Sequence, residues 1–333
     1  MIERSNLRGR SSRSALYARL DEAMTDLRIR LGGLPSPDRA QAIWDDIWVH
    51  EAHSSTAIEG NTLVLREVAE LLVEGRAVGA KPLAEYLEVQ GYGEAARWVY
   101  RQAITPRLDG EDLISLTEVR YVHEMAMSKV WSVAPHSDAF EQERPGSFRR
   151  HDIRAFPGGM KPPSHALVDA KMRDWLDEAN AIREASGHLI EALADIHASF
   201  ERVHPFIDGN GRTGRLLVNL ILVRLGYAPA IIQKRERTQY LAALRKADSE
   251  KVGPLAEILT RAVLDNINRF VIPAIATHDA LVPLPSLATP EVSHIALVNA
   301  ARRGRLRAQR DHSGQWQSTR EWVDAYLVSR YRA

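Results

Sequence analysis

The chain has 333 residues, 45% of them hydrophobic, and its 44 Lys and Arg against 43 Asp and Glu give a formal net charge of +1. This length predicts a main domain of somewhat over about 200 residues plus an appendage, and the small net charge excludes a global field that would drive the chain toward nucleic acid or a membrane. The chain has no cysteine, which excludes disulfides, thiolate metal sites and cysteine nucleophiles and is consistent with a reducing compartment.

The N-terminal segment, MIERSNLRGRSSRSAL, is rich in Arg and Ser but lacks the apolar region of a signal peptide. Elsewhere no run of the sequence approaches the roughly 18 apolar residues of a membrane-spanning helix. We therefore expect a cytoplasmic protein with no membrane partner.

Apolar residues with a helical period dominate the first 275 residues, so the fold class is expected to be mainly α. The stretch 37–60 carries one apolar stripe and ends at Gly60, a good helix terminator. That stripe consists of Ala40, Ile43, Trp44, Ile47 and Trp48. We interpret its two tryptophans as core residues rather than as a platform for stacking bases.

The remaining predicted helices cover residues 65–74, 80–103, 111–130, 165–185, 188–203, 215–225, 237–248 and 253–272. Among them, 215–225 is apolar nearly all round, which predicts a central buried helix. Residues 144–163 break the pattern, because Phe148, Ile153 and Phe156 are loosely spaced between Pro and Gly clusters. This spacing predicts a small irregular β-hairpin or flap.

The C-terminal residues change in composition after Pro273. Residues 281–290 are expected to form a linker, 291–303 a helix, RLRAQR and QWQS a small hairpin, and 320–329 a last helix. Five arginines gather around this hairpin: Arg302, Arg303, Arg305, Arg307 and Arg310. The order resembles small winged-helix or excisionase-type helix-turn-helix modules, so residues 285–333 are a candidate contact for DNA phosphates. A dimer contact or a docking arm is the alternative, and the sequence favours neither.

The most informative stretch is HPFIDGNGRTGR, residues 204–215. Its GNGRTG matches the G-x-G-x-x-G pattern of dinucleotide folds, but that fingerprint requires a preceding strand, whereas an amphipathic helix ending near Val203 leads in here. No Walker lysine follows. We therefore reject the dinucleotide interpretation.

A glycine-rich turn that opens directly onto an apolar helix still leaves N–H groups unpaired, with the positive end of the helix dipole behind them. Arg212 and Arg215 are one helical turn apart and can fork onto phosphates. Asp208 is a hard oxygen ligand for Mg²⁺, and His204 can take a proton from a hydroxyl. Together these residues predict transfer of a phosphorus group to a hydroxyl.

The pattern H-P-F-x-D-G-N-G-R-x-x-R at 204–215 resembles the full signature of the Fic (Fic/Doc) family. The resemblance implies a helical bundle that transfers AMP from ATP, with Mg²⁺ or Mn²⁺, to a Ser, Thr or Tyr hydroxyl of a target protein. It implies that His204 is the base, Phe206 a buried anchor and Asp208 the metal ligand. The other implied site residues are Gly209, Asn210 and Gly211 around the transferred phosphate, Arg212 and Arg215 on the outer phosphates, and Tyr240 near the adenine. The segment 146–157 would be the flap that docks the target.

A second match is SSTAIEG, residues 54–60, which resembles the family's inhibitory helix through Ser55, Glu59 and Gly60. Ser55 and Glu59 are four residues apart and share a helix face. By the resemblance, Glu59 pairs with Arg215 and denies it to the γ-phosphate of ATP, so the resting enzyme would be weak.

These matches imply three regions: an N-terminal helical region at 1–110 with the inhibitory helix at about 40–60, a Fic core at 111–275 and a winged-helix-like domain at 276–333. Other functions stay open, namely transfer of UMP, phosphocholine or phosphate, removal of AMP, and a DNA-binding regulator whose Fic domain senses nucleotide. Family members are often regulated as dimers, so a homodimer is a further expectation. His197 lies seven residues before His204 and suggests a metal site with Asp208, but we favour a packed core histidine.

Overall fold

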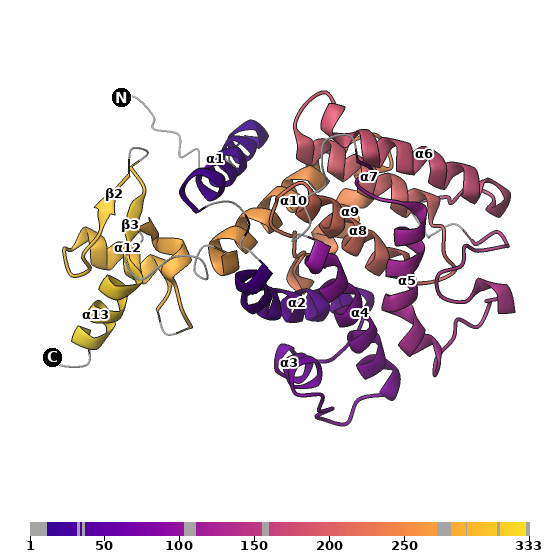
Figure 1. Cartoon of the computed structure of the whole chain (residues 1–333), viewed down its shortest axis with the longest axis horizontal. Helices are drawn as coiled ribbons and strands as arrows, with labels where there is room; N and C mark the ends of the chain where they lie inside the picture. Colours follow the sequence, from indigo (N-terminus) through magenta and orange to yellow (C-terminus); the bar gives the residue numbers. More distant parts are fainter. Residues whose placement is uncertain are drawn as a thin grey trace, which may run out of the picture.

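The structure is a computed structural model of the whole chain, and it describes residues 12–31, 34, 37–102, 111–154, 160–271, 281–290, 292–311 and 314–330. Helices make up most of the described part, and a small three-stranded sheet lies in the C-terminal region (Figure 1). The expected fold class, mainly α, is confirmed.

Twelve α-helices occur in the described residues: α1 Arg13–Leu31, α2 Pro37–Glu59, α3 Leu65–Val73, α4 Leu83–Arg101, α5 Leu116–Trp131, α6 Val168–Asn180, α7 Leu189–Val203, α8 Asn210–Arg224, α9 Arg237–Ala247, α10 Gly253–Asn266, α12 His294–Arg302 and α13 Arg320–Arg330. Every helix expected between 37 and 272 is present, with ends shifted by a few residues. The sequence interpretation missed α1, because its buried apolar residues form a narrow stripe with charged residues between them in the sequence. That stripe consists of Leu16, Leu20, Met24 and Leu27.

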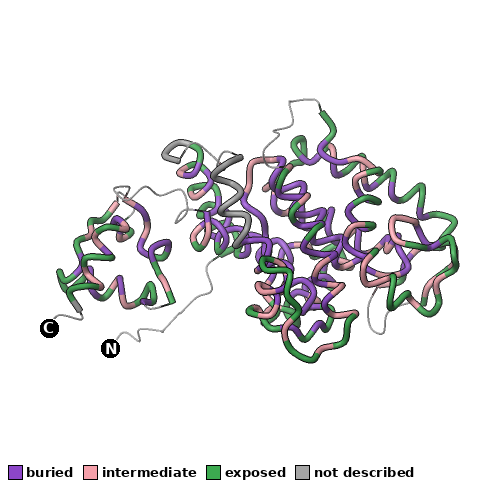
Figure 2. Tube along the Cα trace, turned by 60° about the horizontal axis from the view of Figure 1, so that its bottom comes forward, coloured by how far each residue is buried: buried purple, intermediate pink, exposed green. Residues whose placement is uncertain are grey.

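Helix α8 is the centre of the bundle and contacts α2, α4, α5 and α7. Its residues are buried along almost its whole length, and Figure 2 shows that the buried residues gather in the middle of the bundle. The helix begins at Asn210, five residues before the expected start, because Gly209 adopts a left-handed conformation at φ 78° that ends the preceding loop. All of the GNGRTG stretch after Gly209 therefore belongs to the first turns of a helix.

The segment 144–163 contains no strand within its described residues, so the expected β-hairpin is wrong there; Phe156 lies outside the described residues. A short 3₁₀-helix at Glu141–Glu143 precedes it. The backbone groups of this segment bond to buried side chains instead of to a partner strand. Glu143 accepts from the N–H of Phe140 and of Arg150, and Arg149 donates to the carbonyls of His151 and Pro163.

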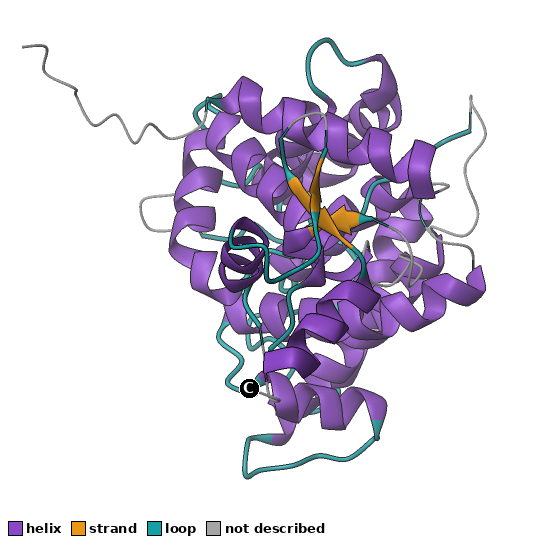
Figure 3. Cartoon of the chain, turned by 90° about the vertical axis from the view of Figure 1, so that its left-hand side faces the viewer, coloured by secondary structure: helices purple, strands orange, loops and turns teal. Residues whose placement is uncertain are grey.

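The C-terminal sheet has the order β1-β3-β2, with β1 at Val282–Pro283, β2 at Gln309–Arg310 and β3 at Trp316–Ser318, all antiparallel (Figure 3). The predicted hairpin is therefore present between α12 and α13. The expected linker at 281–290 is wrong, because Val282 pairs with Ser318 and the next residues form a 3₁₀-helix, Leu284–Leu287, with both leucines buried.

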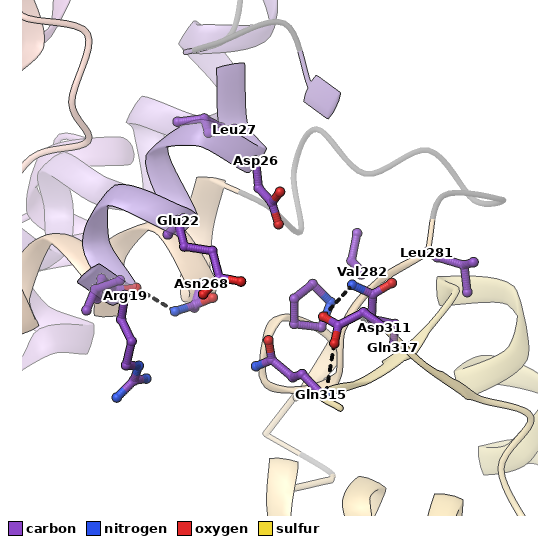
Figure 4. A pocket seen from close by; sticks show the side chains of 13 residues that line it. Arg19, Glu22, Asp26, Leu27, Asn268, Leu281, Val282, Asp311, Gln315 and Gln317 are labelled. Atoms are coloured by element: carbon purple, nitrogen blue, oxygen red, sulfur yellow. Dashed lines mark hydrogen bonds between the residues drawn. The ribbon is translucent and has the colours of Figure 1, made fainter. Parts of the chain in front are cut away.

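Helix α1 packs on α10, and a cavity of about 110 Å³ separates it from the C-terminal sheet. Figure 4 shows Arg19, Glu22 and Asp26 of α1 on one side of this cavity and Asp311 and Gln317 on the other. In the stripe expected on α2, Ile47 and Trp48 are buried, which confirms Trp48 as a core residue. The side chains of Ala40, Ile43 and Trp44 lie outside the described residues.

Helices α4 and α5 approach so closely at Gly91 that a Cβ atom there would lie 2.6 Å from the carbonyl oxygen of Ala126. Because backbone cannot move aside cheaply, Gly91→Ala should destabilise the bundle by about 1–3 kcal/mol. Urea unfolding followed by circular dichroism measures this. Glu94→Ala is the control, since this exposed residue makes only a surface pair with Lys129 and should change stability by less than about 1 kcal/mol. Equal stability of Gly91→Ala and the control would contradict the close approach.

Candidate active site

His204 occupies the bend between α7 and the loop. It is the C-cap of α7 and adopts a left-handed conformation, with φ 48° and ψ 61°, which is uncommon for a residue other than glycine. Its backbone N–H donates to the carbonyl of Phe200 at 3.0 Å. Nδ1 of the ring lies 3.3 Å from the carbonyl oxygen of Glu201. Since a carbonyl only accepts, Nδ1 carries the proton in this contact, and Nε2 carries the lone pair.

Burial is the main reason that the pKa of His204 is lowered to about 4, and the charge of Arg149 adds to the shift. The imidazole is therefore neutral at physiological pH. A neutral imidazole at the mouth of the loop can accept a proton, as a general base must.

The loop between His204 and α8 is held from inside. Phe206 is fully buried, and Asn210 bonds to both backbone groups of Phe206, with Oδ1 accepting from the N–H at 2.9 Å and Nδ2 donating to the carbonyl at 2.8 Å. The N–H of Gly209 donates to Oδ1 of Asp208 at 2.6 Å. The side chain of Asn210 thus fixes the loop, and at the start of α8 the N–H groups of Asn210, Gly211 and Arg212 have no carbonyl one helical turn earlier to receive them.

Arg212 is held between two carboxylates. Nη1 donates to Glu88 of α4 at 2.6 Å, and Nη2 donates to Asp208 at 2.9 Å. The Arg212 side chain is only 9% exposed and that of Glu88 13%, so the contact with Glu88 lies largely out of water. Glu88 was not singled out from the sequence; it also accepts from Nδ2 of Asn61, one residue after Gly60, at 2.9 Å.

Arg215 is buried and bonds to the end of α2. Nε donates to Oγ of Ser55 at 2.7 Å, and Nη2 donates to the carbonyl of Ser55 at 3.1 Å and to Glu59 at 2.7 Å. Burial alone would raise the pKa of Glu59, but the charge and hydrogen bond of Arg215 lower it. The structure therefore brings together Ser55, Glu59 and Arg215, which are about 160 residues apart in the chain.

Two glycines make this contact possible. Gly60 ends α2 with φ 117°, directly after Glu59. Gly211 lies beside the carboxylate, and a Cβ there would be 2.7 Å from Oε1 of Glu59. A larger residue at Gly211 would push the carboxylate away from Arg215, whereas at Gly60 it would strain the backbone directly after Glu59.

Tyr240 lies behind Arg215 rather than on an open surface. It is 1% exposed, its ring faces the guanidinium of Arg215 at 5.9 Å, and its hydroxyl lies 2.7 Å from Nε2 of His197. His197 is likewise buried, and its pKa is lowered to about 3 by burial and by the charge of Arg215. The expectation of a hydrogen-bonded core histidine is confirmed.

Asp208 is the residue that could hold a metal ion. Its side chain is 41% exposed, and only Oδ1 is used by Gly209 and Arg212 in the contacts above. The described residues contain no group of three or more His, Asp or Glu that could hold a metal ion. One carboxylate fits Mg²⁺, which usually binds through one or two carboxylates together with substrate phosphates.

Besides Glu88, three further neighbours of the loop escaped the sequence interpretation: His123, Arg149 and Glu201. His123 interrupts the apolar stripe of α5 and bonds to the carbonyl of Asp208, and Arg149 bonds to the carbonyl of His204. Glu201 is buried beside Arg215, and burial raises its pKa to about 7. A polar residue within an apolar helical stripe was the one available signal, and it points to His123 and Glu201 only.

Comparison with known proteins agrees with the family resemblance of the loop 204–215. Residues 113–222 match the sequence model of the Fic/DOC family. Over 217 residues the chain is 30% identical to Protein adenylyltransferase Fic of Drosophila willistoni, covering 64% of this chain and 40% of that protein. Over 243 residues it is 28% identical to the protein of the same name from Aedes aegypti, covering 73% and 45%.

A solved structure of Fic-1 from C. elegans superposes with a TM-score of 0.62 at 26% identity, covering 78% of this chain and 72% of that one. The chain therefore has the fold of Fic-domain structures. It spans less than half the length of the two curated relatives. No helix among the described residues is long and apolar enough to cross a membrane.

Glu201→Gln tests the electrostatics behind Arg215. A carboxyl group whose folded pKa is about 7, above its value of 4.5 in the unfolded chain, contributes stability below pH 4.5 that is lost as the pH rises through 7. Glutamine cannot ionise, so the melting temperature of the variant minus that of the wild type should increase between pH 6 and pH 8. Differential scanning calorimetry at both values measures it. Glu184→Gln, at an exposed position, is the control, and its melting temperature should differ from that of the wild type by the same amount at both pH values. The same result for Glu201→Gln would contradict the raised pKa of Glu201.

Proposed function

We propose that this chain, whose residues 113–222 form a Fic domain, is a protein adenylyltransferase that transfers AMP from ATP to a Ser, Thr or Tyr hydroxyl of a target protein. The observation that carries the proposal is the loop 204–215, in which a neutral imidazole, helix N–H groups without a carbonyl acceptor and two guanidinium groups converge. The names of the similar proteins from Drosophila willistoni and Aedes aegypti support the same activity.

In this reaction the oxygen of the target hydroxyl attacks the α-phosphorus of ATP, the bond from that phosphorus to the pyrophosphate breaks, and the hydroxyl proton moves to Nε2 of His204. The hydrogen bond from Nδ1 to Glu201 keeps the lone pair on Nε2. The N–H groups at the start of α8 stabilise charge that develops on the phosphate oxygens. Asp208 would hold Mg²⁺, which neutralises phosphate charge when bound.

Glu59 would keep this enzyme in a resting state. Its carboxylate competes with the γ-phosphate for the same edge of Arg215, and Ser55 occupies Nε of the same guanidinium. While both contacts persist, ATP has no bidentate partner at Arg215 and binds in an unproductive position. The ring of Tyr240 packs behind the guanidinium of Arg215 and supports it. A contact between Tyr240 and adenine would therefore require that guanidinium to move.

A different phosphorus transfer by the same loop, or removal of AMP, is the second candidate function. The favouring observation is that the groups proposed to bind substrate, namely the N–H groups at the start of α8 and the guanidinium groups of Arg212 and Arg215, all suit phosphate, and none of them selects which end of the substrate moves. Mass spectrometry of the product separates these reactions, because each leaves a different added mass.

Glu59→Gly should raise adenylylation by about 10-fold or more, because a charge-assisted bond to Arg215 of about 1.5–3 kcal/mol is lost. Intact-mass spectrometry after incubation with Mg²⁺ and ATP measures self-modification. Glu74→Gly, an exposed glutamate at the end of α3, is the matched control and should behave as wild type. No gain in Glu59→Gly, with ATP binding retained, would contradict the proposed brake.

His204→Ala in the Glu59→Gly protein should abolish transfer while the dissociation constant for ATP changes by less than about 3-fold, since the phosphate-binding groups remain. Isothermal titration with a non-hydrolysable ATP analogue measures binding, and incorporation of labelled AMP measures transfer. Residual transfer at the rate of the Glu59→Gly protein would show that another group is the base.

We also propose that the C-terminal module contacts DNA phosphates, because Arg302, Arg303 and Arg305 are exposed together at the end of α12. Replacing all three by alanine should weaken binding to any duplex and reduce the slope of log K against log salt by about 3. Fluorescence anisotropy with a labelled duplex measures both. Arg173→Ala, on α6 of the bundle, is the control. If the wild type binds no duplex, or binds it with an affinity that does not depend on salt, the dimer or docking role is favoured.

A further inference from the structure

The loop that carries the proposed base contains two left-handed residues, His204 at φ 48° and Gly209 at φ 78°. Glycine adopts this conformation freely, but for His204 it costs free energy, so surrounding contacts must hold it. Two side chains outside the loop bind the carbonyl groups at these bends. They are Arg149, from the segment that follows the 3₁₀-helix Glu141–Glu143, and His123, from α5.

Arg149 has a fully buried side chain with 0% exposure. Nε donates to the carbonyl of His204 at 2.9 Å, and Nη2 donates to the carbonyls of Pro163 at 2.6 Å and Val203 at 3.4 Å. Its backbone N–H donates to the carbonyl of Pro205 at 2.9 Å. A cation thus binds the last carbonyls of α7, where the helix dipole is negative, and holds three consecutive residues of the loop entrance.

It is unusual for a guanidinium group with a purely structural role to be buried in this way. The nearest carboxylate oxygen of Asp152 is 4.0 Å away, so the donors of Arg149 are directed mainly to carbonyl oxygens. Only a planar group with several fixed donors can bond to carbonyls on both sides at once. Lysine carries the same charge but lacks this fork.

His123 performs the corresponding role at the second bend. It is 2% exposed, its ring stacks on Phe206 with centroids 3.6 Å apart, and Nε2 lies 3.0 Å from the carbonyl of Asp208. Nδ1 accepts from the N–H of Gly146 at 2.8 Å. Because a backbone N–H only donates and a carbonyl only accepts, both contacts are satisfied by one neutral tautomer, with the proton on Nε2.

Both side chains therefore connect the loop to the segment 143–150. Gly146 of that segment bonds to His123, and Arg149 belongs to it. We infer that Arg149 and His123 are positioning residues that hold the two bends of the loop, so that His204 and the anion-binding N–H groups keep their geometry before substrate arrives. Arg149 acts through the carbonyl of His204, and His123 acts through the carbonyl of Asp208. This inference deepens the proposed adenylyl transfer and rests on it for its kinetic readout.

The experiment compares Arg149→Ala, Arg149→Lys and His123→Phe in the Glu59→Gly protein, with Arg150→Ala as the control for loss of a neighbouring exposed guanidinium. We expect kcat to fall about 100-fold in Arg149→Ala, because a small displacement of a base costs this much, while the dissociation constant of a non-hydrolysable ATP analogue changes less than about 3-fold. Arg149→Lys should not restore kcat. His123→Phe keeps the stacking on Phe206 and should still lower kcat.

A second readout does not depend on transfer. Deuterium uptake of the peptide covering residues 203–211 should rise in Arg149→Ala and His123→Phe and stay unchanged in Arg150→Ala. In addition, guanidinium chloride at low concentration should partly restore the kcat of Arg149→Ala but not that of His123→Phe, because a cavity of about 610 Å³ lined by Ser147, Arg149 and His165 gives access.

An unchanged kcat, or an unchanged deuterium uptake in folded protein, would overturn the inference, and so would loss of ATP binding in parallel with kcat in Arg149→Ala. If Arg149→Ala does not fold, Arg149→Lys decides by the same criteria. If the Glu59→Gly protein itself transfers nothing, the proposed function fails, and the deuterium uptake still tests the positioning role.

Discussion

The structure depends on a cation, Arg215, that is buried in the first turns of the central helix. Burying an unpaired charge is costly, so the fold must supply a negative partner. Glu59 supplies this charge from the end of α2, and Ser55 adds a neutral hydrogen-bond acceptor. A phosphate group would satisfy the same donors equally well. The contact with Glu59 and the proposed contact with a nucleotide phosphate are thus two solutions of one electrostatic requirement, and under the proposed function each would exclude the other.

The surroundings of Arg215 favour a single position for it. Tyr240 lies on one side of the guanidinium. Glu51 is buried nearby and accepts hydrogen bonds from Tyr92 and Asn219, and burial raises its pKa to about 7. Close packing on all sides leaves few alternative rotamers. This packing favours the same position of the cation when its partner is removed, and under the proposed function competition for Arg215 would then control nucleotide binding.

The sequence predicted what is local and missed what is long-range. Periodicity found the helices of the bundle, and the loop 204–215 stood out because its residue types and spacing are unusual. Ser55 with Glu59 is an ordinary helix pair by residue type, and only its resemblance to the family's inhibitory helix pointed to it. Glu88 and Arg149 could not be found in this way, because each is an ordinary charged residue until the fold brings it to Arg212 or to the carbonyl of His204. The expected hairpin failed for the same reason, since Arg149 and Glu143 satisfy the backbone that a partner strand would otherwise have paired.

The end of α2 acts on both arginines of the loop, although its two contacts differ in kind. Glu59 bonds directly to Arg215, whereas Asn61 bonds to Glu88, which in turn bonds to Arg212. Gly60 lies between them and fixes their relative orientation through its positive φ. Substitution of Glu59 therefore frees one guanidinium only. Displacement of the turn at 59–61 would break the contacts that hold both guanidinium groups. A binding partner that moved this turn would therefore change the loop more than loss of the Glu59 carboxylate alone.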